Sequence, residues 1–139
     1  MSTVGVKTRF EFDRIDRRTK QITPALISAI TDRIVQHFQP ARIILFGSQA
    51  SKKFIQESDI DLLVVLDDTH IFAPLERRDR VGKLLDLFRF RSFGLDAIVL
   101  TNAEIQTLQE TNEGEWDLIL EILTEGKTLY DRVQKTPTE

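Results

Sequence analysis

The sequence contains no cysteine, and this absence removes several chemistries at once. Disulfide bonds, thiol nucleophiles and thiolate metal sites are all excluded. Histidine is scarce, because only His37 and His70 occur. Neither histidine has a partner at metal-ligand spacing, so we assign no role to either. A chain without cysteine also fits the cytoplasm, which is the compartment we expect.

Long apolar runs and an excess of basic charge are missing too. No stretch of about 18 apolar residues occurs, so we expect no membrane-spanning helix. The first 20 residues lack the apolar core of a signal peptide. The net charge is −3, which gives no overall basic field, and we expect no direct binding of nucleic acid. The chain has 139 residues, of which 41% are hydrophobic and 29% charged, as in one soluble domain.

The spacing of apolar residues predicts alternating helices and strands. A helix is expected from Pro24, capped by Thr23, to the residues before Pro40. Short β-branched or apolar runs predict buried strands, and apolar stripes at helical spacing predict further helices. The expected strands are 42–46, 60–66, 95–100 and a small edge strand at 127–130. The expected helices begin at Pro74, after a cap at Asn102, and after Asn112.

The last of these helices shows a capping-box pattern, with Asn112 followed three residues later by Glu115. Its expected inner stripe is Trp116, Ile119, Leu120 and Leu123.

This order of elements predicts an α/β fold with a small mixed sheet flanked by helices. One helix connects strand 60–66 to strand 95–100, so these two strands should be parallel. We expect residues 1–22 to form an N-terminal arm or edge segment, residues 23–130 the folded domain, and residues 131–139 a polar tail.

Polar residues interrupt the strands at what should be one end of the sheet. Gly47 and Ser48 follow the first strand, and Asp59 and Asp61 open the second after ten intervening residues. If the second strand runs back along the first, these two ends meet, and alternation places both aspartates on the same side. Asp96 is the second residue of the third strand and should reach the same end. The sequence therefore predicts three carboxylates beside a Gly-Ser turn.

Three carboxylates packed together repel one another, and a divalent metal ion would remove the repulsion. Mg²⁺ prefers oxygen ligands and retains positions for water and substrate phosphates. Two such ions can clamp the attacking and leaving oxygens of a displacement at phosphorus. The glycine allows close approach of a phosphate, which the serine hydroxyl and backbone N–H groups can bind. Either pair alone would more often be a solvated strand end, but the combination favours a two-metal phosphoryl- or nucleotidyl-transfer site.

At these residues the chain resembles the polymerase-β-like nucleotidyltransferase superfamily. The similarity rests on LFGSQA, SDIDLLVVL, LDAIVL and EGKTLYD, and it is closest to the minimal nucleotidyltransferases, which are small single-domain prokaryotic proteins. The resemblance implies that Gly47 and Ser48 bind the triphosphate of ATP. It implies that Asp59 and Asp61 hold metal, and that Asp96 binds metal and helps to deprotonate the attacking hydroxyl.

The chain departs from the family pattern in one place. The family commonly has GSxARG, whereas Ser51 and Lys52 stand here in place of the arginine and second glycine. Lys52 and Lys53 could reach a phosphate as point charges, or could belong to a solvated face. Arg89 and Arg91 are candidates for a groove, although basic residues that follow a helix are usually just exposed.

The resemblance also suggests an acceptor. Minimal nucleotidyltransferases are often paired with a small helical HEPN-type ribonuclease toxin, and they act as antitoxins by transferring AMP from ATP to a toxin tyrosine. One alternative is transfer to a small molecule such as an aminoglycoside, although such relatives usually carry extra helical parts. Another alternative is a module that binds and neutralises a partner without catalysis. The intact Asp59, Asp61 and Asp96 argue against that last possibility.

Overall fold

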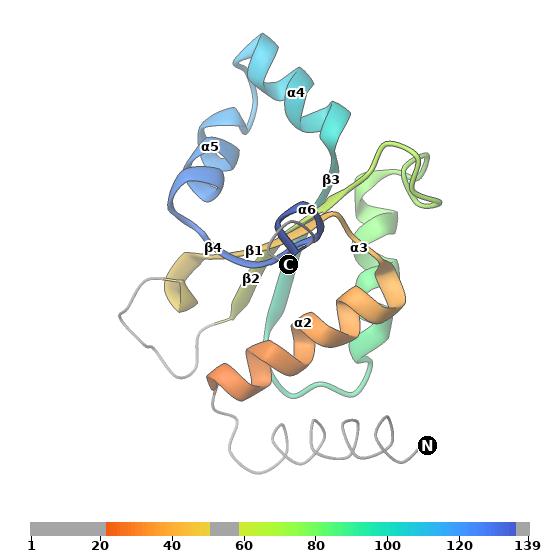
Figure 1. Ribbon diagram of the computed structural model, residues 1–139, viewed down its shortest axis with the longest axis vertical. Helices are drawn as coiled ribbons and strands as arrows, with labels where there is room; N and C mark the ends of the chain where they lie inside the picture. Colours follow the sequence, from red (N-terminus) through yellow and green to blue (C-terminus); the bar gives the residue numbers. More distant parts are fainter. Residues whose placement is uncertain (1–21, 51–58, 136–139) are drawn as a thin grey trace.

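The computed structural model describes residues 22–50 and 59–135, and every structural statement below concerns these residues. Helices and strands alternate, as expected for an α/β fold (Figure 1). The elements are α2 (Pro24–Phe38), β1 (Arg42–Phe46), η1 (Gly47–Gln49), β2 (Ile60–Leu66), α3 (Arg77–Leu85), η2 (Asp86–Phe88), β3 (Leu95–Thr101), α4 (Asn102–Thr111), α5 (Trp116–Glu125), β4 (Lys127–Asp131) and α6 (Arg132–Lys135).

The four strands form one mixed sheet in the order β3-β2-β1-β4. β1 pairs with both β2 and β4 in antiparallel fashion, whereas β2 and β3 are parallel. Helices α2 and α3 lie on one face of this sheet and α4 and α5 on the other (Figure 1). The predicted fold class and strand directions are therefore confirmed.

Alternation along each strand divides the core into two layers. Ile60, Leu62, Val64 and Leu66 of β2 pack against the α2 and α3 face. Leu63 and Val65 point the other way, into the cluster that α4 and α5 complete with Ile105, Ile119 and Ile122. Since the period is two residues, Asp61 shares the α4 and α5 side of the sheet with Leu63.

Helix α2 begins and ends where the sequence predicted. The Thr23 hydroxyl accepts a hydrogen bond from the Leu26 N–H at 3.1 Å, and Pro24 opens the first turn. The helix ends at Phe38, and Gln39 then adopts a left-handed conformation before Pro40. Local capping chemistry fixes both ends of this helix.

Helix α3 begins later than predicted, at Arg77 and not at Pro74. Three successive turns occupy residues 67–75, and one of them is closed by the Ala73 N–H donating to the His70 carbonyl. The reason is Arg80, which is buried and donates to the carbonyls of Phe72 and Ala73, so the preceding chain folds back over it.

The capping box also lies elsewhere than predicted. It is formed by Thr101 and Glu104 at the start of α4, so Asn102 is the first helical residue and not the cap. Asn112 ends α4 in a left-handed conformation. Glu115 precedes α5 without capping it and forms an ion pair with Arg77 instead.

The inner stripe of α5 also differs from the prediction. Ile119 and Ile122 are the buried residues of this helix. Trp116 and Leu123 are only partly buried, whereas Leu120 is 43% exposed. The stripe is therefore shifted, because α5 meets the sheet along a different line from the one that we predicted.

Residues 131–135, the described part of the predicted polar tail 131–139, lie in β4 and α6. β4 is the expected edge strand, and α6 follows it directly. The Arg132 guanidinium donates to both carboxylate oxygens of Asp67, at 2.5 and 2.9 Å. Residues 1–21, 51–58 and 136–139 lie outside the described part, and with them most of the predicted arm and the candidates Lys52 and Lys53.

Of the helices in residues 22–50 and 59–135, none has the length and apolar character needed to span a bilayer.

Candidate active site

The end of β1, the start of β2 and the start of β3 lie side by side. Phe46 is the register partner of Asp61, and Asp61 is in turn the partner of Asp96 on the parallel strand. Directly opposed residues on neighbouring strands point to the same face of a sheet. Asp61 and Asp96 therefore stand next to each other on the α4 and α5 side, as the sequence predicted from strand direction.

Asp59 lies just before β2 and is exposed. The Ile60 N–H beside it donates to the Gly94 carbonyl at 2.9 Å, which ties the start of β2 to the turn before β3. A Cβ atom on Gly94 would overlap the Asp59 carboxylate. Glycine therefore lets the Asp59 carboxylate occupy this position, and a methyl group there would displace it.

Gly94 belongs to the site, although the predicted site did not include it. The available signal was its place directly before the strand that carries Asp96. A glycine that precedes a strand can mark a close approach of another group.

Gly47 is required on the other side of the site. Its φ angle is 76°, a left-handed conformation that other residues rarely adopt. A Cβ on Gly47 would also overlap the Asp61 carboxylate. The turn continues as the short helix η1, in which the Ala50 N–H donates to the Gly47 carbonyl at 3.1 Å. The predicted Gly-Ser turn thus packs directly against the predicted metal ligand Asp61.

Asp61 is partly buried and lies beside two other carboxylates. Burial raises its pKa above the ordinary value, and the negative charges of Asp96 and Asp59 raise it further. Within the described ranges, no lysine, arginine or histidine forms an ion pair with any of the three. Like charges held together without a counter-ion favour a bound cation.

The carboxylates do not by themselves form a complete metal cage. In the part of the chain that the structure describes, no group of three or more His, Cys, Asp or Glu side chains is arranged to hold a metal ion. Mg²⁺ needs less from the protein, because one or two carboxylates together with substrate phosphates usually complete its coordination. The oxygen donors of Asp61 and Asp96 fit that requirement.

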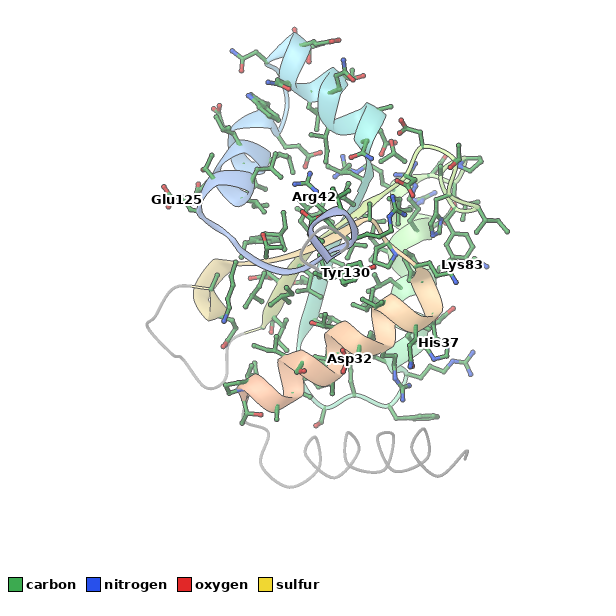
Figure 2. All side chains as sticks on the ribbon, viewed as in Figure 1. Asp32, His37, Arg42, Lys83, Glu125 and Tyr130 are labelled. Carbon is green, nitrogen blue, oxygen red and sulfur yellow. The ribbon has the colours of Figure 1, made fainter. Side chains whose placement is uncertain are left out.

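The other residues considered from sequence lie elsewhere. His70 is structural, since its Nε2 is 2.6 Å from the Phe38 carbonyl oxygen and its Nδ1 accepts from the Phe72 N–H. His37 is exposed in the last turn of α2, at the end of that helix remote from η1 (Figure 2). Arg91 donates to the Phe88 carbonyl, and Arg89 is exposed.

Comparison with known proteins agrees with this architecture. A family model described as "Polymerase beta, Nucleotidyltransferase" matches residues 28–135. Among solved structures, the chain is similar to the crystal structure of "a putative nucleotidyltransferase" from Sulfolobus solfataricus, with 16% sequence identity and a TM-score of 0.50. That match covers 93% of this chain and 88% of the other, and at this identity it supports the fold alone. Among curated proteins, none matches the sequence.

The fold and the carboxylate end of the sheet define a nucleotidyltransferase-type domain. Because the family match spans most of the chain, the protein belongs to the polymerase-β-like nucleotidyltransferase family. The superfamily resemblance is thereby confirmed. The minimal subtype, the roles of the individual aspartates and the toxin partner stay predictions.

Proposed function

We propose that the protein is a Mg²⁺-dependent nucleotidyltransferase that moves AMP from ATP to a hydroxyl group of a protein acceptor. One observation carries the proposal. The half-buried Asp61 carboxylate lies between Asp96 and the Gly47 turn, and like charges and burial raise its pKa. A purely structural carboxylate in such a place would need a cationic partner.

Asp61 and Asp96 are the residues that would hold the metal, with Asp59 completing the set at the exposed rim. When bound, the metal would neutralise phosphate charge and polarise the α-phosphate. The resemblance to minimal nucleotidyltransferases suggests two such ions. The backbone of Gly47 and the following turn would receive the β- and γ-phosphates, because a glycine there leaves the N–H groups accessible.

The reaction is a displacement at the α-phosphorus of ATP. The acceptor oxygen forms a bond to that phosphorus, the bond from the phosphorus to the α,β-bridging oxygen breaks, and pyrophosphate leaves. Asp96 is exposed and is the second residue of β3, beside Asp61, so it is the group that would take the hydroxyl proton and pass it to water. Asp61 would fix the position of the metal, since it is the most buried of the three aspartates.

The acceptor that we propose is a tyrosine of a helical HEPN-type toxin. By modifying this tyrosine the chain would neutralise the toxin and so act as its antitoxin. This proposal rests on the resemblance to minimal nucleotidyltransferases. It is compatible with the exposure of Asp59 and Asp96, which leaves the site open to a large substrate.

The test uses ATP labelled on different phosphates. The full chain is incubated with Mg²⁺ and a HEPN-type protein encoded beside it, in parallel with an aminoglycoside. Label on the α-phosphate should appear on the protein acceptor, whereas label on the γ-phosphate should not. Mass spectrometry should then place one added AMP group on a tyrosine.

Three other results would contradict parts of the proposal. Transfer of γ-label would show phosphorylation and end the nucleotidyl-transfer mechanism. Labelling of the aminoglycoside in place of the protein would replace the acceptor. Tight binding of the partner without transfer of any label would show a binding-only module.

A further inference from the structure

The helices on the active-site face carry charge of one sign. From Asn102 to Gly126 the sequence contains seven acidic residues and no lysine, arginine or histidine. The whole chain has a net charge of only −3, so the acidity is concentrated in this segment. Such a concentration on one layer produces a directed field and not a general one.

Only part of this charge is used inside the fold. Glu104 pairs with the buried Arg80, and Glu115 pairs with Arg77. The other five acidic residues are exposed: Glu110, Glu113, Asp117, Glu121 and Glu125. Within the described ranges, none of these five forms an ion pair.

Two of the five acidic residues line a recess beside the active site. The recess has a volume of about 550 Å³ and lies between α5 and the turn after β1. Helix α5 contributes residues spaced by three, four and seven positions, which share one face of the helix. Its lining residues are Leu118, Glu121, Ile122 and Glu125 on α5, with Gly126 after the helix and Phe46, Gly47 and Ala50 opposite.

The recess adjoins the carboxylate site. Gly47 lines it and also packs against Asp61. Phe46, on the opposite wall, is the strand partner of Asp61. Figure 2 shows Glu125 at the end of α5 that faces η1. A molecule bound in the recess would therefore be held next to the reaction site.

The lining selects for a particular chemistry. Glu121 and Glu125 disfavour phosphate and favour a cation. Leu118 is 41% exposed in the recess wall and is suited to apolar contacts. An amino sugar would match the charge but not the leucine. A protein segment with lysine or arginine beside an apolar side chain matches both.

We propose that this recess, lined by α5 and the Gly47 turn, docks a basic segment of a protein acceptor. The proposal rests on the proposed function, because it names the acceptor class for the same site. Neighbouring strands are about 4.8 Å apart, so β1 and β3 are separated by about 10 Å. An extended segment covers that distance in about three residues. The acceptor hydroxyl should therefore lie about three or four residues from the anchoring cation.

The experiment measures docking without nucleotide, so that it does not depend on catalysis. The full ¹⁵N-labelled chain is titrated with the peptide Lys-Arg-Leu-Tyr-Arg-Lys and, separately, with its acidic counterpart Glu-Asp-Leu-Tyr-Asp-Glu. The basic peptide should shift the amide signals of residues 118–126 and of Gly47, and the acidic peptide should leave them unchanged. ATP binding is followed in a separate titration.

Two matched double variants separate the recess from general acidity. Glu121→Gln with Glu125→Gln removes two charges inside the recess, and Glu110→Gln with Glu113→Gln removes two charges on the same helical layer outside it. The first pair should weaken the Kd of the basic peptide by about 3- to 10-fold, as loss of rim charges does. The second pair should change it less than about twofold, because salt screens distant charges.

Leu118→Ser adds an independent test of the apolar wall. It should weaken binding of the basic peptide several-fold and leave binding of the aminoglycoside neomycin unchanged.

Two results would overturn the proposal. One is an equal loss of peptide affinity in the two double variants. The other is that neomycin binding depends on Glu121 and Glu125 while peptide binding does not. If the peptide docks but no AMP is transferred, the docking surface stands and the proposed reaction fails. If AMP is transferred while the peptide shifts no signal in the recess, the reaction stands and the docking proposal fails.

Discussion

The two ends of strands β2 and β3 differ in how their charged side chains are paired. At the start of these strands lie Asp61, Asp96 and Asp59, and no lysine, arginine or histidine of residues 22–50 and 59–135 forms an ion pair with them. At the far end, beside Val99 and Thr101, the buried guanidinium of Arg80 meets Glu104 and three backbone carbonyls. Both ends place charged residue types against the same sheet, yet among the described residues only the Arg80 end pairs them with opposite charge.

Every N–H group of the Arg80 guanidinium donates a hydrogen bond. Its Nε donates to the Phe72 carbonyl at 3.1 Å. One terminal nitrogen donates to the Val99 carbonyl and to Glu104, and the other to the Ala73 carbonyl and to Glu104. A guanidinium has five N–H donors, and here all five have acceptors. Glu104 in turn accepts from the Thr101 N–H, so the start of α4 is fixed to the same group.

The contrast indicates which end is built for stability and which for a ligand. A fully paired buried ion holds the turns of residues 67–75, β3 and α4 in one arrangement. Carboxylates that repel one another raise the free energy of the folded protein without ligand, and binding of an external cation relieves this repulsion.

Asp61→Asn should have the largest effect of all, and that effect is a loss of activity. The substitution keeps the shape and removes the central charge, so AMP transfer should fall by about 10²–10³-fold, as for loss of one electrostatic contact to a transition state. Pyrophosphate release gives the rate. The control is Asp86→Asn, an exposed aspartate in η2 on the other face of the sheet, which should keep the wild-type rate. A rate for Asp61→Asn within threefold of wild type would remove Asp61 from the mechanism.

Arg80→Met should have the largest effect on stability. It leaves Glu104 and three carbonyls without their donor, so the free energy of unfolding should fall by about 3–5 kcal/mol. Urea titration followed by circular dichroism measures this loss. The matched variant is Arg78→Met, whose side chain is 87% exposed and pairs only with Glu76 at 3.8 Å, and it should cost less than about 1 kcal/mol. Equal stability of the two variants would show that the buried network contributes nothing.

Gly94→Ala should damage the carboxylate end by a smaller amount. The new methyl group would occupy the place of the Asp59 carboxylate, so we expect about a tenfold slower transfer and a stability loss of about 1 kcal/mol. Gly82→Ala is the matched control, because nothing lies within 4 Å of its added Cβ in the middle of α3. That control should raise stability by about 0.5–1 kcal/mol and leave transfer unchanged. Identical behaviour of the two variants would contradict the close approach of Asp59 to Gly94.

The smallest effects are expected from pH, and they should have opposite signs at the two ends. Asp61 binds its proton more tightly in the folded chain, since burial, Asp96 and Asp59 raise its pKa. Its ionised form therefore lowers stability at neutral pH. Asp61→Asn should be more stable than wild type at pH 7, and this difference should vanish as the pH falls toward 3.8, the ordinary value.

Glu104 behaves in the reverse way. Burial alone would raise its pKa, but hydrogen bonds from Arg80 and Thr101 and the charges of Arg80 and Arg77 leave it lowered. Its contribution to stability is present above 4.5, the ordinary value, and is lost as the pH falls through the lowered pKa. Glu104→Gln should thus be less stable than wild type at pH 7 and equal to it in strong acid. Unfolding curves from pH 3 to pH 7 give the free energy of unfolding of wild type, Asp61→Asn and Glu104→Gln. If this free energy depended on pH in the same way in all three proteins, the opposite roles of Asp61 and Glu104 would be contradicted.

The sequence predicted the carboxylate end better than the Arg80 end. Residues 42–46, 60–66 and the edge strand are continuous apolar or β-branched runs, and local composition alone identifies them. Strand direction then brought Asp61 beside Asp96 without any knowledge of side-chain contacts. This end was predictable because adjacent residues and one crossover determine it.

The Arg80 network could not be predicted in the same way. Arg80 stands among other arginines, in the run ERRDRVGK, and nothing local marks it as buried. Its partners are up to 24 residues away and include three carbonyls, which every residue possesses. The displaced start of α3 followed from the same cause. The shifted stripe of α5 likewise depends on how that helix meets the sheet.

The most direct test of the central claim is where a divalent cation binds. The ¹⁵N-labelled chain is titrated with Mn²⁺ in the presence of ATP, and broadening of amide signals by the paramagnetic ion is recorded. β2 has seven residues, so its ends are about 20 Å apart, and broadening falls steeply over that distance. We predict that Gly47, Asp61 and Asp96 broaden, that Thr101 and Glu104 stay sharp, and that Asp61→Asn abolishes the effect. Broadening at the Thr101 end, or an unchanged pattern in Asp61→Asn, would contradict the account.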